Sequence, residues 1–213
     1  VPGVTAGIAV PAYAGIPVTH RGMATSVTLI TGHNRENEPG KRLALDNIAL
    51  TGTLVFYMGV KNLPTVVDEL RRVGRPAATP AAVIEWGTYG RQRTVLATLD
   101  TLVARCAEAG VQPPAVVVVG EVARLHEAIP WFERRPLFGK RIAVTRSRSQ
   151  ASELVRALRA MGADVFEFPT IQIMPAETLD DFGYIGDYDW IVFTSVNGVD
   201  MLFDRLDALG NDA

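Results

Sequence analysis

The sequence predicts an α/β fold, and three observations carry this prediction. Short β-branched or fully apolar runs alternate along the chain with segments whose apolar residues recur at helical spacing. Glycine or proline separates most of these segments. The 213 residues are 48% apolar, which is ample for a packed core. We therefore expect layers of helices against a sheet rather than a β-sandwich.

The first 122 residues contain four predicted strands and three predicted helices. Predicted strands, β-branched or wholly apolar, span 25–32, 52–59, 81–88 and 114–122. Predicted helices span 5–13, 62–74 and 93–110. Thr5 and Asn62 are expected to cap the first two helices, and Gly15 with Pro17 to stop the first. The polar segment 33–42 is predicted to be a surface loop.

The periodicity breaks at 125–141, and a new α/β unit follows. Its predicted strands span 140–146, 164–173 and 189–195, and its predicted helices span 149–163 and 197–206. We place a domain boundary near residue 135, which gives domains 1–135 and 136–213. The second domain holds too few strands for an open sheet, and the chain begins without Met. We therefore expect the chain to be cut at both ends.

Composition argues against several classes of function. The formal net charge of −2 offers no basic field for nucleic acid, and no apolar stretch approaches the roughly 20 residues of a membrane span. No secretory signal pattern is present. The lone Cys106 cannot form a disulfide within the chain, so a reducing cytoplasm is expected. The three histidines, His20, His33 and His126, are too scattered to suggest a metal cluster.

Three glycine-flanked segments are candidate ligand contacts. PGVTAG (2–7) places a helix N-terminus after a Pro-Gly turn, while YMG (57–59) and EWGT (85–88) end apolar strands. Ligands of open α/β sheets lie beyond strand ends, so these segments are expected to converge on one cleft. The alternative is that they are ordinary turns and that Met58 fills the core. Phosphate-binding glycine loops, HExxH and GxSxG are absent from the sequence.

Five strings in a fixed order carry a family resemblance over residues 1–135. They are VPGVTAGIAVPAYAGIPVTHRG, ITGH, TLVFYMGV, GRPAATPAAVIEWGTYGRQRTVLATL and PPAVVVVGEVARLHEAIPWFE. This stretch resembles the C-terminal half of the uroporphyrinogen-III C-methyltransferases, within the tetrapyrrole methylase family. Behind it, PLFGKRIAVTRSRSQASELVRALRAMGADVFEFPTIQIMP and DYDWIVFTSVNGVDMLF resemble the start of uroporphyrinogen-III synthase. The resemblance implies a mixed sheet with flanking helices, followed by a partial flavodoxin-like α/β unit.

The resemblance implies transfer of two methyl groups from S-adenosyl-L-methionine to ring carbons of uroporphyrinogen III, which gives precorrin-2 for sirohaem or cobalamin. The fused synthase would cyclise hydroxymethylbilane. Thr5, Ala6, Met58 and Gly87 match the family's cofactor-contact positions. The family's acid and base groups lie in its first domain, whose motifs are absent from these 213 residues. The chain alone is therefore expected to be inactive, its catalytic residues stay unknown, and a homodimer is expected.

The tetrapyrrole substrate implied by the resemblance carries eight carboxylates, which guanidinium groups bind well. His20 and Arg21 are the first candidates for substrate contact, with Arg91 and Arg93 weaker. The alternative for these arginines is solvation or pairing with a surface carboxylate. His20 is either a proton carrier or, as we favour, a hydrogen-bonded turn residue.

Within the synthase-like segment, FTSVNGV (193–199) is the one binding-type turn. Ser195 and Asn197 are candidate substrate contacts there, and the favoured alternative is that they cap the following helix. Two further classes of function remain as alternatives for the whole chain. One is a non-catalytic tetrapyrrole- or nucleotide-binding module. The other is a nucleotide-dependent oxidoreductase, against which the missing phosphate loop argues.

Overall fold

A computed structural model of the chain describes residues 2–32, 45, 52–146, 148–170, 172, 174, 186 and 188–208. The predicted loop 33–42, with His33, lies outside the described residues. Contacts divide the chain into two compact units, one of residues 1–143 and 153–166 and one of residues 144–152 and 167–213. The predicted family boundary near residue 135 is a different division and stays a prediction.

A five-stranded mixed sheet forms the centre of the first unit. Its strands are β1 (Val27–Thr31), β2 (Thr53–Tyr57), β3 (Pro80–Glu85), β4 (Arg93–Thr98) and β5 (Ala115–Val119), in the spatial order β1-β2-β5-β3-β4. β1 and β2 run parallel, and the other neighbouring pairs are antiparallel. The predicted strands in this region are confirmed, as is the mixed sheet that the resemblance implies.

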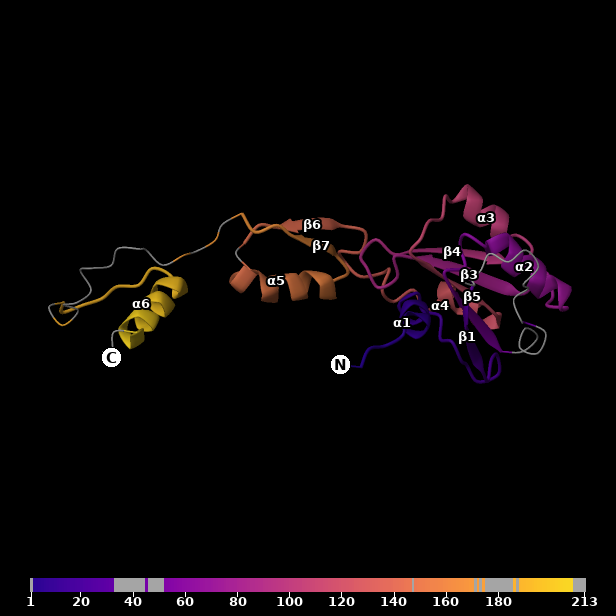
Figure 1. Cartoon of the computed structure of the whole chain (residues 1–213), viewed down its shortest axis with the longest axis horizontal. Coiled ribbons are helices and arrows are strands. Elements are labelled where there is room, and N and C mark those ends of the chain that lie inside the picture. Colours follow the sequence, from indigo (N-terminus) through magenta and orange to yellow (C-terminus); the bar gives the residue numbers. More distant parts are fainter. Residues whose placement is uncertain are drawn as a thin grey trace. The chain divides into compact units, whose positions relative to one another are not determined.

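Helices cover both faces of this sheet. α2 (Leu63–Arg72) and α3 (Leu102–Glu108) pack on one face, as Figure 1 shows. α1 (Ala6–Tyr13) and the short η1 (Glu121–Arg124) pack on the other, with α4 (Leu125–Ala128) next to η1. Alternate residues of β2 and β5 enter the two cores, so that Leu54 faces α2 while Val55 faces α1. The three layers bury apolar side chains on both sides of the sheet, which explains the continuous apolar run of β5.

The two capping predictions are right in position and wrong in mechanism. Thr5 and Asn62 occupy the N-cap positions of α1 and α2, but neither side chain makes a capping hydrogen bond. Asn62 Nδ2 instead donates to the carbonyl of Gly32, 3.0 Å away. Gly15, with φ at 69°, does end α1 as expected.

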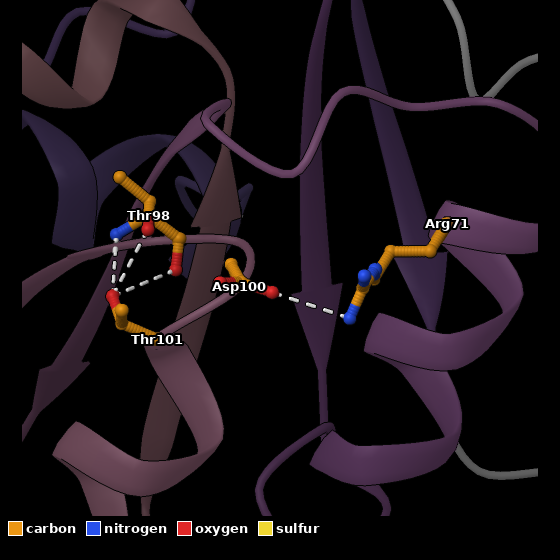
Figure 2. A network of polar contacts seen from close by, with 4 residues as sticks. All are labelled: Arg71, Thr98, Asp100 and Thr101. Carbon is orange, nitrogen blue, oxygen red and sulfur yellow. Dashed lines mark hydrogen bonds and ion pairs between the residues drawn. The ribbon is translucent and has the colours of Figure 1, made fainter.

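The predicted helix over 93–110 is wrong in its first third. Residues 93–98 form β4, which pairs with β3 from Pro80 opposite Thr98 to Glu85 opposite Arg93, and α3 begins only at Leu102. Strand pairing has overridden helical spacing, because the β-branched Thr94 and Val95 suit a sheet. Figure 2 shows the turn that separates the two elements, where the Thr101 hydroxyl accepts from the Thr98 amide at 3.1 Å. Asp100 pairs with Arg71 of α2 at 3.2 Å.

A second, two-stranded sheet follows the first. β6 (Arg141–Val144) and β7 (Asp164–Glu167) are joined by α5 (Arg148–Ala160), in the predicted order. The strand predicted over 164–173 is too long, because β7 ends at Glu167 and residues 168–170 form no strand. Asp164 N donates to Lys140 O and Phe168 N to Val144 O, each at 2.9 Å, so the strands run in the same direction. The unit is therefore a β-α-β element, in keeping with the α/β prediction for this segment.

The predicted strand over 189–195 is wrong. No strand is assigned in 188–195, and Trp190 and Val192 are 88% and 83% exposed. An apolar run indicates a demand for burial, but a strand also needs a hydrogen-bonding neighbour, and none pairs with this segment among the described residues. The helix predicted behind it is confirmed as α6 (Val196–Ala208).

Candidate functional site

One edge of the large sheet gathers the ends of three strands. β1, β2 and β3 all finish there, and β5 begins there, with Thr31 opposite Tyr57, Tyr57 opposite Val116, and Glu85 opposite Ala115. The segments just beyond are hydrogen-bonded side by side. Gly32 N donates to Tyr57 O at 2.8 Å, and Trp86 N donates to Pro114 O at 3.1 Å.

Helix α1 reaches this edge from one face and contacts two of the strand ends. The Tyr57 hydroxyl accepts from Gly7 N at 3.0 Å and is hydrogen-bonded to the Thr5 hydroxyl. On the other side, Gly87 lies against Val10, so closely that a Cβ on Gly87 would stand 2.4 Å from Val10 Cγ1. The structure thus brings together the three glycine-flanked segments singled out in the sequence.

Strained backbone is concentrated at the same edge. Among the described residues, three non-glycine residues have positive φ: Met58 at 52°, Trp86 at 48° and Thr88 at 75°. Residues other than glycine rarely adopt this backbone conformation, and it persists where the surrounding structure enforces it, commonly at ligand sites. Sequence reasoning missed the positive φ of Trp86 and Thr88, because their residue types do not predict it.

A pocket of about 430 Å³ opens beside Met58. Its wall is largely apolar and consists of Met58, Val60, Lys61, Pro113, Pro114 and Ala115. The volume falls within the roughly 300–1,000 Å³ of small-molecule sites. Met58 is 63% exposed, so the alternative that it fills the core is wrong. Lys61 supplies the charged group of this lining and was not singled out in the sequence.

Behind the 86–92 turn lies a polar cluster of four side chains, those of Gln92, Thr94, His126 and Glu133. Gln92 Oε1 accepts from Thr88 N, and Gln92 Nε2 donates to Glu133 Oε1, each at 3.0 Å. Glu133 Oε1 also accepts from the Thr94 hydroxyl at 3.0 Å, and Glu133 Oε2 lies 3.7 Å from His126 Nε2. The WFE string contains Glu133, but its partners Gln92 and Thr94 lie 41 and 39 positions earlier, which local sequence cannot reveal.

The predicted substrate contacts of the first segment fall into two groups. His20 and Arg21 are exposed in a tight turn, in which His20 N donates to Ala24 O at 2.9 Å. Arg91 is instead stacked 3.6 Å above the centre of the Trp86 ring, and its Nε lies 3.7 Å from Asp164 Oδ2. The alternative of a paired arginine therefore describes Arg91, and a substrate contact by it stays a prediction.

Arg93, the other weaker candidate, is paired as well. Its Nε donates to Glu85 Oε2 at 2.6 Å, and the carboxylate is nearly buried, with 4% of Glu85 exposed. Gln112 N donates to the other oxygen of Glu85 at 2.5 Å. Arg93 therefore neutralises an internal carboxylate.

Ser195 caps α6. Gly198 N, in the first turn of the helix, donates to the Ser195 hydroxyl at 3.2 Å. Asn197 lies within that first turn. The capping alternative is thus confirmed for Ser195, and contact of either residue with a ligand stays a prediction.

Two absences apply to the described residues alone. Within the ranges that the structure describes, no three His, Cys, Asp or Glu side chains gather where they could hold a metal ion. In the same ranges, every helix is too short or too polar to cross a membrane.

Comparison with known proteins assigns the two segments. Residues 1–103 match the family model of the Tetrapyrrole (Corrin/Porphyrin) Methylases. This segment is thus similar to the tetrapyrrole methylases. Residues 152–213 match the model of Uroporphyrinogen-III synthase HemD. A methylase-like segment is therefore followed by a synthase-like segment, in the order that the sequence motifs predict.

Relatives align with nearly all of the chain. The chain is 39% identical over 220 residues to the porphyrin biosynthesis protein HemD of Ruminiclostridium josui, and the alignment covers 100% of this chain and 43% of the relative. It is 38% identical over 209 residues to a uroporphyrinogen-III C-methyltransferase of Bacillus subtilis (strain 168), which covers 97% of this chain and 43% of that one. The chain thus spans less than half the length of these relatives.

A solved structure supports the methylase fold. The cobalt precorrin-4 methyltransferase of cobalamin biosynthesis is similar with a TM-score of 0.52 and 23% identity, over 58% of this chain and 52% of that one. At this identity the likeness concerns the fold alone. It agrees with the mixed sheet and flanking helices of the first unit.

Proposed function

We propose that the methylase segment forms one wall of the S-adenosyl-L-methionine site of a uroporphyrinogen-III C-methyltransferase. The observation that carries the proposal is the meeting of α1, the end of β2 and the β3–β4 turn at one strained edge beside an apolar pocket. The name of the Bacillus subtilis relative agrees with this activity. Because the chain covers 43% of each, the activity of the whole protein is inferred and needs direct measurement.

The residues at this edge suit the proposed cofactor. The pocket beside Met58 has a largely apolar lining, which suits an adenine ring. Met58 itself is exposed and has a left-handed backbone conformation. Thr5, Ala6, Met58 and Gly87 would hold the cofactor. Lys61, in the same lining, offers a cation for its carboxylate. When bound, the cofactor supplies an electrophilic methyl group on a sulfonium.

The part of this wall in catalysis is to position and to shield. Methyl transfer to carbon is an in-line displacement, so the rate depends on holding donor and acceptor in line and excluding water. The left-handed backbone of Met58 and the close packing of Gly87 against Val10 suit that task. The acid and base groups are expected from the family's first domain. Arg21, exposed beside His20, is the stronger of the predicted carboxylate contacts, since Arg91 and Arg93 are already paired.

The remaining proposals concern the assembly. Residues 136–213 would be the start of a uroporphyrinogen-III synthase domain, with Ser195 and Asn197 at its substrate. Fusion would place consecutive steps on one polypeptide, which we propose to be a cytoplasmic homodimer without nucleic-acid or membrane partners. Light scattering of the purified polypeptide tests the dimer, and cell fractionation tests the compartment.

The decisive experiment measures methyl transfer by the full natural polypeptide that contains these residues. Uroporphyrinogen III is supplied with methyl-labelled S-adenosyl-L-methionine, and two labelled methyl groups per precorrin-2 are expected. No incorporation would refute the methylase proposal. Calorimetry with S-adenosylhomocysteine on the 213-residue chain should show little or no binding, and tight binding would contradict the view that only one wall of the site is present.

A further inference from the structure

Two parts of the proposed cofactor wall are connected by a polar cluster that does not itself line the site. One part is α1, which carries Ala6 at its start and follows Thr5. The other is the 86–88 turn, which carries Gly87. The two parts touch directly where Gly87 meets Val10. A second connection runs through Gln92, Glu133 and His126, and it reaches the backbone of both parts.

On the side of the turn, the cluster fixes a strained residue. The amide of Thr88, whose φ is 75°, donates to Gln92 Oε1 at 3.0 Å. Gln92 is only 4% exposed, so its amide group needs partners inside the protein. Glu133 supplies one by accepting from Gln92 Nε2 at 3.0 Å. Glu133 thereby orients the side chain that holds the turn.

On the side of the helix, the cluster reaches the C-terminal end of α1. His126 Nδ1 lies 2.7 Å from the carbonyl oxygen of Ala14, and His126 Nε2 lies 3.7 Å from Glu133 Oε2. The side chains of His126 and Glu133 are 13% and 22% exposed, so this contact lies largely away from solvent. Trp131 Nε1 adds a second bond to α1 by donating to Ala12 O at 2.8 Å.

We propose that Glu133 is a positioning residue for the methyl-donor site, and that it holds the Gly87 turn in place against α1 through Gln92 and His126. The inference rests on the proposed function. Its reason is geometric, because the carboxylate is shared between a group bonded to the turn and a group bonded to the helix. Glu133 does not line the Met58 pocket, so it acts through these partners.

Three variants of the full natural polypeptide test this role. Glu133→Ala removes both connections. Glu133→Gln keeps an oxygen that accepts from Gln92 Nε2 and Thr94 Oγ1, and loses only the negative charge facing His126. Glu127→Ala is the matched control, since it removes an exposed carboxylate from the same segment. None of these residues is among the proposed contacts of cofactor or substrate.

For Glu133→Ala we expect a roughly tenfold higher Kd for S-adenosylhomocysteine in calorimetry, the size of one lost charge-assisted hydrogen bond. We also expect a raised KM for S-adenosyl-L-methionine and an unchanged KM for uroporphyrinogen III. Glu133→Gln should stay within about threefold of wild type, and Glu127→Ala should match it. In the ligand-free protein, hydrogen exchange at residues 86–92 should accelerate in Glu133→Ala alone.

The outcomes separate this inference from the proposed function. If the wild type does not bind S-adenosylhomocysteine, the proposed function fails, and hydrogen exchange alone decides whether Glu133 holds the turn. If the wild type binds and Glu133→Ala binds equally well, the inference is overturned. Uniformly faster exchange across the large sheet, without rescue by Glu133→Gln, would also overturn it, because Glu133 would then be a general stabiliser.

Discussion

Replacing Gly87 with alanine should force α1 away from the β3–β4 turn. An ideal Cβ at Gly87 would stand 2.4 Å from Val10 Cγ1, 2.6 Å from Cγ2 and 2.8 Å from Cβ. Carbon atoms normally approach to about 3.5 Å, so a shift of roughly 1 Å is required. Rotating Val10 gives little relief, because its own Cβ is too close and valine is stiff in helices. Overpacking of this kind costs about 1–3 kcal/mol, and three simultaneous clashes place Gly87→Ala near about 2–3 kcal/mol.

A double-mutant cycle with Val10→Ala tests the cause of this loss. Val10→Ala removes two methyl groups, at about 0.8 kcal/mol each, and should cost about 1.6 kcal/mol alone. It also removes the two closest clashes, so the double variant should be about 2 kcal/mol more stable than the sum of the single effects. Denaturant unfolding of the 213-residue chain, followed by circular dichroism, measures all four corners of the cycle.

The control is Gly3→Ala, at a glycine with no atom within 4 Å of the added Cβ. It should change the free energy of unfolding by less than about 0.5 kcal/mol. Strict additivity of Gly87→Ala and Val10→Ala would refute the reasoning, because it would mean that the two residues do not compete for one space. A Gly87→Ala chain as stable as wild type would refute it equally.

Three other perturbations have expected results. Burial and then the charge of Glu85 raise the pKa of the Cys106 thiol from its ordinary 9.0 to about 11, so the proton stabilises the folded state. The free energy of unfolding should therefore be unaffected by this group below pH 9 and should fall by up to about 1.4 kcal/mol per pH unit from pH 9 to about 11. Denaturant titrations should show no such loss in Cys106→Ala, and equal pH profiles of the two proteins would contradict this. Arg93→Ala should cost about 2 kcal/mol, below the 3–5 kcal/mol of a fully buried pair because Arg93 is half exposed; a neutral effect in thermal unfolding would show that water already screens Glu85. Asp100→Ala, which breaks an exposed ion pair, should cost less than about 0.5 kcal/mol, whereas Thr101→Ala should cost about 1 kcal/mol; the reverse ranking would refute the account of this turn.

The sequence was sufficient for most elements because their boundaries are local. Gly15 at a positive φ and the amphipathic spacing of α2 and α6 can be recognised from neighbouring residues. Residues 93–98 could not be assigned in this way, since their strand exists only through pairing with β3. Segment 189–195 shows the converse case, in which an apolar run has no strand beside it among the described residues.

The candidate site was predictable to the same extent. Glycines at strand ends drew attention to Met58 and Gly87, and a resemblance assigned them a ligand. The sequence alone could not show that Arg91 lies over Trp86 or that Arg93 neutralises Glu85, because these contacts form only in the folded protein. Charge made the arginines substrate candidates, and the structure pairs the two weaker ones, Arg91 and Arg93, with carboxylates.

The roles of glycine at this edge are better separated by their contacts than by their sequence context. Gly7 and Gly87 have crowded surroundings, where an added Cβ would meet the Tyr57 hydroxyl at 2.3 Å and Val10 at 2.4 Å. Both are therefore required for close packing of α1, whatever binds nearby. Met58, by contrast, keeps a side chain at a positive φ and leaves it 63% exposed, which packing does not require. Of the predicted cofactor contacts, Met58 is thus the one whose conformation is hardest to explain without a ligand, and Met58→Ala is the substitution most able to change affinity without changing the fold.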